Sequence, residues 1–327
     1  MIISKAPVRL SLGGGGTDLQ SYYKKYGGFV MSCAINKYVY IMLNRRFEES
    51  TRISYSKTEI VDDIKDIEHN IFREALKYLN VTKHLELVSI ADVPSNCGLG
   101  TSSVFTVSLL NSIFNFKNEF VPLNTLAEIA CHIEIEILKE PIGKQDQYSA
   151  AFGGFNAYHF NTDGTVEIEP VCIPENVLYE LHNNIILFYL NKKRSASEIL
   201  SDQNIKSIEN NRNTIERLHK IKEIGIYTKK IFENGNIDGF GEILHNHWMT
   251  KKGLSDKISN EFIDEVYNLA LKNGALGGKV IGAGGGGFIL FYCPRNKQKL
   301  VDTMAKFDLK PMWFSFEKEG AKILLNN

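Results

Sequence analysis

The sequence predicts a globular protein of two domains that mixes helices with strands. Its 327 residues exceed the length of one typical compact domain, and 43% of them are hydrophobic, which is ample for two cores. Stretches that alternate polar and apolar residues are followed by stretches with apolar residues at helical spacing, so strands precede helices in the N-terminal half. We place the domain boundary near residue 180, giving domains 1–180 and 181–327.

The charge and cysteine content favour a small-molecule partner. Lys and Arg total 38, as do Asp and Glu, so the net charge is zero and lacks the signature of a nucleic-acid or acidic-membrane binder. The five cysteines are widely spaced and never form a C-x-x-C pair, which argues against a disulfide framework or a zinc knuckle. With no basic-then-apolar leader and no apolar run of ~20 residues, we expect a cytoplasmic protein.

The first strand is expected over 5–12, where every second residue is apolar and Arg9 and Ser11 lie on the opposite face. That face can look into a cleft, so Arg9 is placed to meet a ligand. The loop Gly13–Asp18 follows, and residues 19–26 have helical spacing before a Gly-Gly stop.

Asp18 stands at the start of that expected helix. It could simply be the N-cap residue, which is a common role for Asp. The four consecutive glycines before it cost backbone entropy that a mere turn would not require. We therefore favour the close approach of a ligand at Gly13–Asp18.

Further strands are expected over 29–35, 38–44 and 52–56, and a helix over 68–79. The stretch Pro94–Val104 then lies between a strand at 84–91 and a second helix. Gly98 and Gly100 have no Cβ to block close approach of backbone N–H groups to a ligand, and three hydroxyl residues, 101–103, stand beside the unpaired amides of the first helical turn. This favours an anion site, and phosphate is the anion we expect there. The alternative is an ordinary turn with a Thr or Ser N-cap.

Two carboxylates lie on the next expected helix, which ends at Glu140-Pro141 and Gly143. At ~100° per residue Glu134 and Glu136 point in nearly opposite senses, and Glu134 falls among the apolar positions. A carboxylate there should be paired, hydrogen-bonded or bound to a metal, and a structural ion pair is the simpler alternative. Asp146 precedes a short helical stretch, where capping is the simpler role.

The rest of the chain continues the mixed pattern. Strands are expected over 155–160, 166–173, 185–190, 277–282, 286–292 and 310–316, and helices over 197–232, 240–251, 260–272 and 296–307. The run Lys192–Arg194 is either a solvated charge cluster or a contact for a phosphate-bearing substrate. His245 and His247 are two apart on a helix, so they make a poor metal pair and are interpreted as surface or packing residues.

The last glycine cluster, Gly282–Gly287, formally contains G-x-G-x-x-G. It precedes a strand rather than a helix, so it lacks the context of a dinucleotide site. Three glycine-rich stretches in order nevertheless resemble the GHMP kinase superfamily. Residues 6–18 resemble its first motif, residues 94–103 its phosphate loop and residues 282–287 its third motif.

Within that superfamily the chain is most similar to the D-glycero-D-manno-heptose 7-phosphate kinases, through residues 13–18, 98–103 and 193–197. The resemblance implies an α+β fold of two domains, with an N-terminal domain like domain 2 of ribosomal protein S5 and a ferredoxin-like C-terminal domain. ATP and the sugar would lie between them.

The resemblance also implies roles for residues, with ATP and Mg²⁺ as cofactors. Asp146 would accept the hydroxyl proton, Arg9 would stabilise the ionising hydroxyl, and Ser102 and Glu134 would hold Mg²⁺. ATP would be bound by Pro94, Ser95, Asn96, Cys97, Gly98, Leu99, Gly100, Thr101, Ser102 and Ser103. The sugar would be bound by Gly14, Gly15, Gly16, Thr17, Asp18, Lys193, Arg194, Gly284 and Gly285.

Two departures from the family pattern bear on the substrate. Galactokinases have Glu-His where this chain has Gly15-Gly16, so its pocket should be roomier and galactose is disfavoured. The phosphate loop reads Thr101-Ser102-Ser103 in place of the usual Ser-Ser-Ala, and Ser102 is assigned to the metal by alignment. Because Lys192–Arg194 favours a phosphorylated acceptor, the predicted reaction converts heptose 7-phosphate to the 1,7-bisphosphate, a step toward nucleotide-activated heptose and cell-surface glycans.

Two alternatives stay open. One is another GHMP kinase, for fucose, galactose or a related hexose. The other is a non-catalytic nucleotide and sugar sensor, against which the presence of both Glu134 and Asp146 argues, because a sensor needs no proton acceptor. A nucleic-acid or membrane partner is not expected, and a homo-oligomer is left open.

Overall fold

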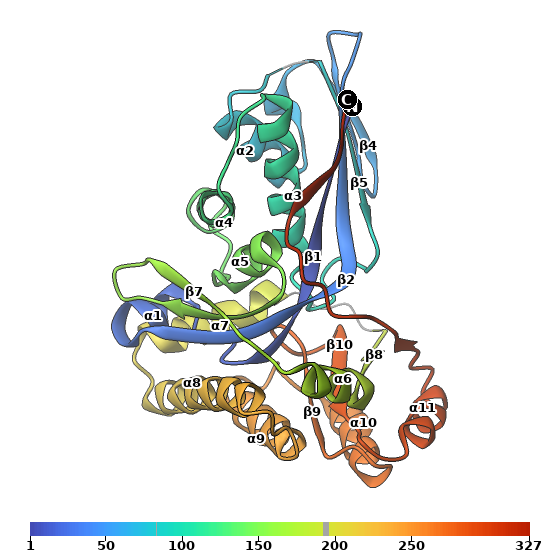
Figure 1. Cartoon of the computed structure of the whole chain (residues 1–327). Coiled ribbons are helices and arrows are strands. Elements are labelled where there is room, and N and C mark those ends of the chain that lie inside the picture. The colour runs from blue at the N-terminus through green and yellow to red at the C-terminus, as the bar shows by residue number, and fades with distance from the viewer. Residues whose placement is uncertain (83, 192–195) are drawn as a thin grey trace.

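The computed structural model describes residues 1–82, 84–191 and 196–327. Its larger sheet contains β1 (Ile2–Gly13), β2 (Gly28–Arg45), β3 (Thr51–Ser54), β4 (Thr58–Val61), β5 (Leu85–Ala91), β6 (Phe155–Phe160), β7 (Val166–Pro170) and β12 (Lys322–Asn326). The strand order is β12-β1-β2-β5-β3-β4, and β6 and β7 branch from β2. β1 and β2 run through the height of this sheet in Figure 1.

β2 is one strand of 18 residues where the sequence predicted two. Its pairing with β1 shifts register between Pro7 and Val8, so Asn36 and Lys37 are accommodated as a bulge and the strand does not end. The first part of β2 pairs with β6 and the second part with β5. The sheet therefore divides along β2 into two arms that share β1.

Helices cover one face of this sheet: α2 (Asn70–Tyr78), α3 (Thr101–Phe116), α4 (Leu123–Cys131) and α5 (Gln145–Phe152). α3 packs on both β1 and β2 and is buried on nearly every side, as its apolar composition requires. α4 continues into a π-helical segment, η2 (His132–Ile137), while α1 (Gln20–Tyr26) follows the glycine loop and stops at Gly27, as predicted.

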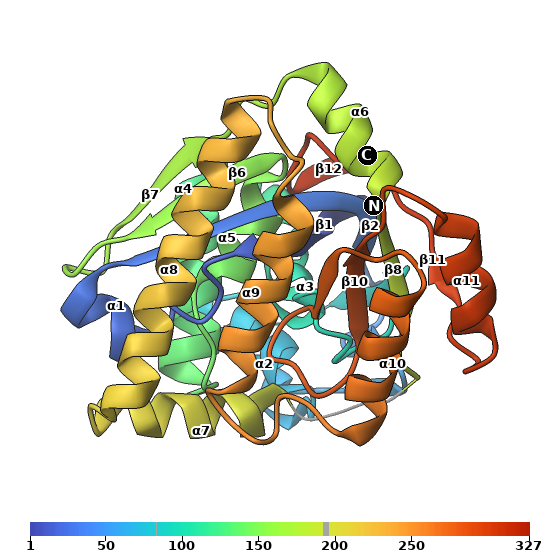
Figure 2. The same ribbon diagram turned by 90° about the horizontal axis from the view of Figure 1, so that it is seen from below.

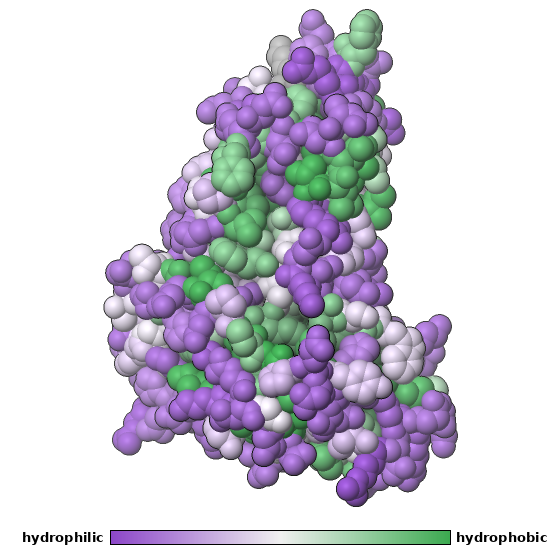
Figure 3. Space-filling model, viewed as in Figure 1, coloured by the Kyte–Doolittle hydropathy of each residue, from purple (hydrophilic) through white to green (hydrophobic). Residues whose placement is uncertain are grey.

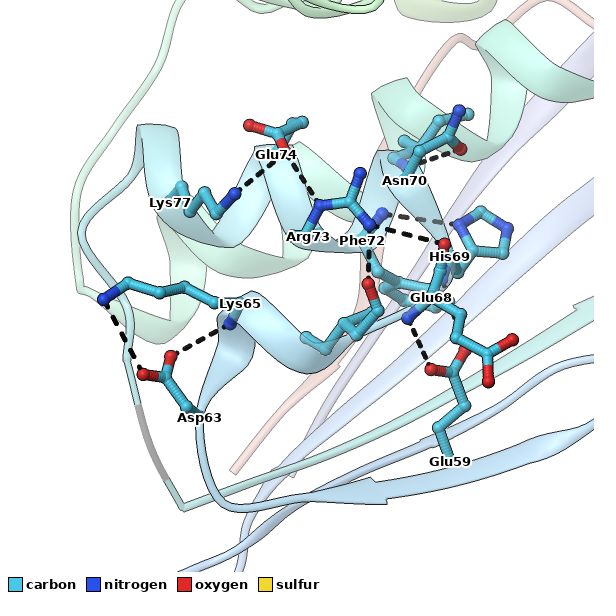
Figure 4. A network of polar contacts seen from close by, with 12 residues as sticks. Glu59, Asp63, Lys65, Glu68, His69, Asn70, Phe72, Arg73, Glu74 and Lys77 are labelled. Carbon is cyan, nitrogen blue, oxygen red and sulfur yellow. Dashed lines mark hydrogen bonds and ion pairs between the residues drawn. The ribbon is translucent and has the colours of Figure 1, made fainter.

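A polar network away from this packing fixes the start of α2 (Figure 4). Glu59 of β4 accepts hydrogen bonds from the backbone nitrogens of Glu68 at 2.6 Å and His69 at 3.3 Å. The His69 ring in turn accepts from the Phe72 nitrogen at 3.4 Å, capping α2. The network anchors α2 to the edge of the sheet and has a structural role.

The smaller sheet contains β8 (Ile185–Tyr189), β9 (Gly277–Val280), β10 (Phe288–Tyr292) and β11 (Pro311–Met312), in the order β11-β8-β10-β9 with every neighbour antiparallel. The helices around it are α6 (Glu175–Asn184), α7 (Ala196–Ile208), α8 (Arg212–Glu233), α9 (Phe240–Lys252), α10 (Glu261–Lys272) and α11 (Lys297–Ala305). A strand, helices, two strands, a helix and a strand make the βαββαβ order of a ferredoxin-like unit, so the predicted fold class is confirmed. α6 was not predicted.

The two sheets are joined by α8 and by the end of the chain. α8 packs against β1 and β2, and in Figure 2, which is seen from below, α8 and α9 lie in front of those strands. Gly13 and Gly225 allow close approach there, since a Cβ on Gly13 would lie 2.7 Å from the Gly225 Cα. β12 returns to the larger sheet, and the Met1 amino group donates to the Asn327 carbonyl at 2.9 Å. The boundary near residue 180 stays a prediction, but a single cut there would separate β12 from its sheet.

On the face shown in Figure 3, apolar surface occurs in small areas separated by hydrophilic side chains. None of the helices in the described ranges is long and apolar enough to cross a membrane. All five cysteines have free thiols, and four of them are buried.

Candidate active site

A cavity of about 270 Å³ lies where the two sheets meet. Its walls come from β1 and the loop after it, the phosphate loop, η2, the loop before α5, and α7, α9 and β9 of the other layer. The predicted site residues that line it are Arg9, Gly15, Gly16, Asp18, Asn96, Gly98, Gly100, Thr101, Ser102, Ser103, Glu134 and Asp146. The structure thus brings residues of the first motif and of the phosphate loop together with Glu134 and Asp146.

The phosphate loop (Pro94–Ser103) is shaped by three residues with positive φ. Asn96, Gly98 and Gly100 have φ angles of 58°, 85° and 79°, so successive N–H groups turn toward one side. α3 begins at Thr101 with Gly100 as its N-cap and without a side-chain cap hydrogen bond. The first-turn amides are therefore left for a ligand, and the ordinary Ser or Thr cap that the sequence allowed is not formed.

The remaining loop residues support this geometry. Cys97 and Leu99 are buried, and Pro94 and Ser95 are exposed; none of the four side chains lines the cavity. Any contribution of Ser95, Cys97 and Leu99 to a ligand would come through backbone N–H groups, and Pro94 has none. The Thr101 hydroxyl donates back to the Pro94 carbonyl at 3.3 Å and so closes the loop.

Ser102 and Glu134 meet across the cavity wall. The Ser102 hydroxyl donates to Glu134 Oε1 at 3.1 Å, and the Gln147 amide donates to Glu134 Oε2 at 2.7 Å. Glu134 is only 1% exposed, and no Lys, Arg or His forms an ion pair with it among the described residues. The structural ion pair that the sequence left open is therefore not the role of this carboxylate.

Burial governs the electrostatics of Glu134. Desolvation raises its pKa to about 7, against the lowering effect of hydrogen bonds from Gln147, Ser103 and Ser102, and the nearby Asp146 raises it further. A divalent cation would reverse this penalty. No group of three or more His, Cys, Asp or Glu side chains in the described ranges could hold a metal by itself. One carboxylate and one hydroxyl do fit Mg²⁺, which keeps waters and takes phosphate oxygens as its other ligands.

The π-helical segment η2 decides which residues of this helix face inward. As predicted, Glu134 and Glu136 diverge, and Glu136 is exposed beside Lys139. Ile137 follows Ile133 at helical spacing and would be buried with it in a regular helix, but it is 38% exposed. The wider turn shifts the phase of the helix, and the 3.6-residue period used for the prediction no longer applies.

Arg9 holds Asp146 at the mouth of the phosphate loop. Arg9 Nε donates to Asp146 Oδ1 at 2.8 Å and Nη2 donates to Oδ2 at 2.9 Å, while Nη1 donates to the Gly98 carbonyl at 2.6 Å. Asp146 lies so close to Gly100 that a Cβ there would be 2.9 Å from its carboxylate. Asp146 stands in the first turn of α5, and the cap residue of that helix is Lys144, so capping does not explain it.

Asp18 is buried in the same cavity. It accepts hydrogen bonds from the Gly16 nitrogen at 2.9 Å and the Gln145 nitrogen at 3.1 Å, and α1 is capped by Leu19 instead. Burial and the neighbouring Asp146 raise its pKa. Gly143 makes room for it, because any Cβ at residue 143 would overlap the Asp18 carboxylate.

Gly14 and Thr17 lie behind the cavity wall, and we revise both from substrate contact to loop support. The Thr17 hydroxyl donates to the carbonyls of Gly14 and Phe29, each at 2.8 Å. Gly14 has a φ of 83° and packs against Phe29 so closely that a Cβ would overlap that carbonyl. These contacts give the glycine loop its shape and leave no hydroxyl for a ligand.

The third motif contacts the phosphate loop more than the cavity. A Cβ on Gly282 would lie 2.7 Å from the Gly98 Cα, and the Phe288 nitrogen donates to the Cys97 carbonyl at 3.1 Å. Gly284 and Gly285, predicted to contact the sugar, pack instead on Ile258. Gly282 and Ala283 are the residues of this motif that line the cavity. Lys193 and Arg194 lie outside the described residues.

Sequence reasoning missed several polar residues of the cavity: Ser11 as a ligand contact, Gln145, Gln203, His247, Lys251 and Lys279. His247, assigned to the surface or to packing, is 1% exposed and lines the cavity. A usable signal existed, because His247 and Lys251 are four residues apart and share one face of α9. Ser11 Oγ, Gln145 Oε1 and His247 Nε2 are buried without a hydrogen-bond partner in the described structure, as expected of atoms that await a ligand.

The chain matches two protein-family models, GHMP kinases N terminal domain over residues 67–154 and GHMP kinases C terminal over residues 228–307. It is 33% identical to the D-glycero-alpha-D-manno-heptose 7-phosphate kinase of Campylobacter jejuni over an alignment 334 positions long, which covers 98% of each chain. The crystal structure of a D-glycero-D-manno-heptose 1-phosphate kinase from Bacteroides thetaiotaomicron is similar with a TM-score of 0.83, 27% identity and coverage of 100% of both chains. Streptococcus pneumoniae phosphomevalonate kinase, in complex with phosphomevalonate and AMPPNP, shares the fold at 16% identity and a TM-score of 0.77, with 97% of this chain and 100% of that chain covered.

Proposed function

The chain belongs to the GHMP kinase family and is a sugar kinase, and on that premise we propose that it phosphorylates the anomeric hydroxyl of D-glycero-D-manno-heptose 7-phosphate with ATP. The products would be the 1,7-bisphosphate and ADP. The observation that carries the proposal is the pairing of Asp146 with Arg9 directly against Gly100 of the phosphate loop. This geometry supports Asp146 as the proton acceptor, beside the expected position of the transferable phosphoryl group.

Phosphoryl transfer requires groups that hold the phosphates, accept the proton of the hydroxyl and stabilise the developing charge, and we assign a set of residues to each task. The open amides at the start of α3 would hold the ATP phosphates. Asp146 would take the proton of the sugar hydroxyl as its oxygen attacks the γ-phosphorus, while the bond to the β-γ bridging oxygen breaks and ADP leaves. Arg9 orients the Asp146 carboxylate through two hydrogen bonds and would stabilise negative charge on the attacking oxygen.

Ser102 and Glu134 would hold Mg²⁺, since together they present a hydroxyl and a buried carboxylate without a cation partner among the described residues. Bound there, Mg²⁺ supplies neutralisation of the phosphate charge.

The choice of sugar rests on the relatives and on the shape of the pocket. Two similar proteins are named for phosphates of D-glycero-D-manno-heptose. Gly15 and Gly16 line the cavity, and the absence of larger side chains at these two positions supports an acceptor longer than a hexose. Asp18, held by two backbone amides, has lone pairs left to accept from sugar hydroxyls.

The test is a panel of acceptors assayed for ADP release. Heptose 7-phosphate, its dephosphorylated form, fucose, galactose and mannose would each be offered with Mg²⁺-ATP. We expect the highest kcat/KM on heptose 7-phosphate, and phosphorus NMR of the product should show a new anomeric phosphate. A preference for any neutral sugar would refute the substrate assignment while leaving the kinase family intact.

A further inference from the structure

Two lysines are buried at the cavity without an acidic partner. Lys251 on α9 is 8% exposed and Lys279 on β9 is 2% exposed, and both line the cavity. Neither ammonium forms an ion pair with a carboxylate of the described residues; Lys251 donates to the Gly282 carbonyl and Lys279 to Nδ1 of His247 at 3.0 Å. Lysine is almost never buried unless paired, because the ammonium loses its hydration.

The charged groups around each buried lysine are mainly cations, whereas a buried ammonium normally has an acidic partner. Burial lowers the pKa of Lys251 to about 7, and Arg9 lowers it further, while Asp18 partly opposes the shift. Burial together with Lys251 and Arg9 brings the pKa of Lys279 well below its usual value. The carboxylate of Asp146 is engaged by Arg9. An anion entering the cavity would relieve this repulsion.

His247 supplies a third group. Its Nδ1 lies 3.0 Å from Lys279 Nζ, and with the lysine as the donor the proton of the neutral ring lies on Nε2. That Nε2 is buried and has no hydrogen-bond partner in the described structure. Burial and the adjacent lysines lower the pKa of His247 well below its usual value, which favours the neutral ring. The Nε2–H group is thus an unused donor on a residue that lines the cavity.

We propose that Lys251, Lys279 and His247 form a binding site for a phosphate group within the cavity. Two lysine side chains and one N–H donor suit a tetrahedral dianion, which accepts hydrogen bonds in several directions and whose negative charge favours the ammonium form of both lysines. The inference rests on the proposed function, which brings two phosphates to this cavity: the terminal phosphate of the acceptor and the phosphoryl group in transfer. The two lysines and His247 come from α9 and β9, and Lys251 donates to Gly282, a residue that packs on Gly98 of the phosphate loop.

The first experiment measures binding without turnover. Thermal unfolding of the wild type would be followed with and without inorganic phosphate at constant ionic strength, beside Lys251→Met and Lys279→Met. The matched control is Lys252→Met, which alters the next residue of α9, a lysine paired with Asp264 away from the cavity. Phosphate should raise the Tm of the wild type and of the control, because a ligand that binds the native state stabilises it. Each of the two buried-lysine variants should lose at least half of that increase, and an unchanged increase in both would overturn the site.

Folding of the variants is checked in the same experiment. Removing an unpaired buried charge should not lower the Tm of the free protein. Replacing a lysine with a purely structural role would lower it. If Lys279→Met fails to fold, Lys279→Gln takes its place, because its amide can still donate to His247 while the charge is gone. The same loss of phosphate response is expected.

Kinetics then distinguish the two phosphates. If the site binds the acceptor's phosphate, Lys279→Gln should raise KM for heptose 7-phosphate about tenfold or more and leave KM for ATP and turnover of the dephosphorylated sugar unchanged. If it binds the phosphoryl group in transfer, kcat should fall on both sugars. Unchanged constants on both sugars would overturn the inference. A wild type that responds to phosphate but does not turn over heptose 7-phosphate would instead refute the proposed function and leave the site standing.

Discussion

Arg9 and Asp146 form a two-point contact, Nε to Oδ1 at 2.8 Å and Nη2 to Oδ2 at 2.9 Å, between β1 and α5. The Arg9 side chain is 3% exposed and that of Asp146 is 22% exposed. The arginine is thus fixed by packing, while the carboxylate keeps an open side toward the cavity. Under the proposed function, this arrangement would orient the Asp146 carboxylate to accept a proton from the bound sugar.

Asp146→Asn is expected to lower kcat by ~10²–10⁴-fold with little change in KM for the sugar, because it removes proton acceptance but keeps size and hydrogen bonding. Steady-state kinetics with saturating ATP would measure both constants. The control is Asp264→Asn, the same change at an aspartate paired with Lys252 outside the cavity. Near-normal turnover of the Asp146 variant would exclude this residue as the base.

Glu134→Gln should stabilise the free protein in a pH-dependent manner. The pKa of Glu134 is about 7 in the folded protein against 4.5 for the free side chain, so the native state favours the protonated acid. That preference is fully favourable below about pH 4.5 and is lost as the pH rises through 7, at a cost of up to about 3 kcal/mol. Glutamine does not ionise, so the Tm of the variant should exceed that of the wild type at pH 8 and approach it at pH 5.

The matched control for that experiment is Glu136→Gln, an exposed carboxylate on the same segment, which should show no such pH-dependent difference. Activity gives the second readout: Glu134→Gln should turn over slowly and be partly rescued by higher Mg²⁺, since one anionic ligand is lost. A variant of lower Tm at pH 8, with an ordinary Mg²⁺ dependence, would favour a structural role for Glu134.

Gly143→Ala should weaken sugar binding selectively. The added Cβ would overlap the Asp18 carboxylate and push it away from the Gln145 nitrogen. If the positioned carboxylate contributes about 1.4 kcal/mol to sugar binding, its loss raises KM for the sugar about tenfold. KM for ATP should stay nearly unchanged. Gly239→Ala is the control, because its Cβ would meet no atom within 4 Å. Equal effects of the two substitutions would remove Asp18 from the sugar site.

Arg194→Ala tests the cation run Lys192–Arg194, and it rests on the sequence alone because these residues lie outside the described ranges. If Arg194 contacts the distal phosphate, KM for the sugar phosphate should rise much more than KM for ATP, since a bidentate charge-assisted contact is lost from one substrate only. Activity on the dephosphorylated sugar should hardly change. Equal losses on both sugars would show that Arg194 does not contact the distal phosphate of the sugar.

Local sequence patterns predicted the individual helices and strands well where the spacing of apolar residues follows one uniform period. The alternation in β1 correctly predicted that Arg9 and Ser11 lie on the face opposite the apolar residues. Helical spacing correctly predicted that Glu134 points inward. The same reasoning failed where geometry departs from a uniform period. The bulge at Asn36 and Lys37 was interpreted as a break between strands, and the π-helical turn exposed Ile137.

The sequence by itself determined the phosphate loop, the inward carboxylate and the family resemblance, because these depend on neighbouring residues and on the order of motifs. Only the tertiary structure decided that Gly143 accommodates Asp18, that β12 closes the larger sheet, and that Lys251, Lys279 and His247 converge on one cavity. Each of these three contacts joins elements that are distant along the chain. Their contacts are set by how α9 and β9 pack beside the larger sheet, and a local hydrophobic period carries no information about which distant residue a side chain will meet.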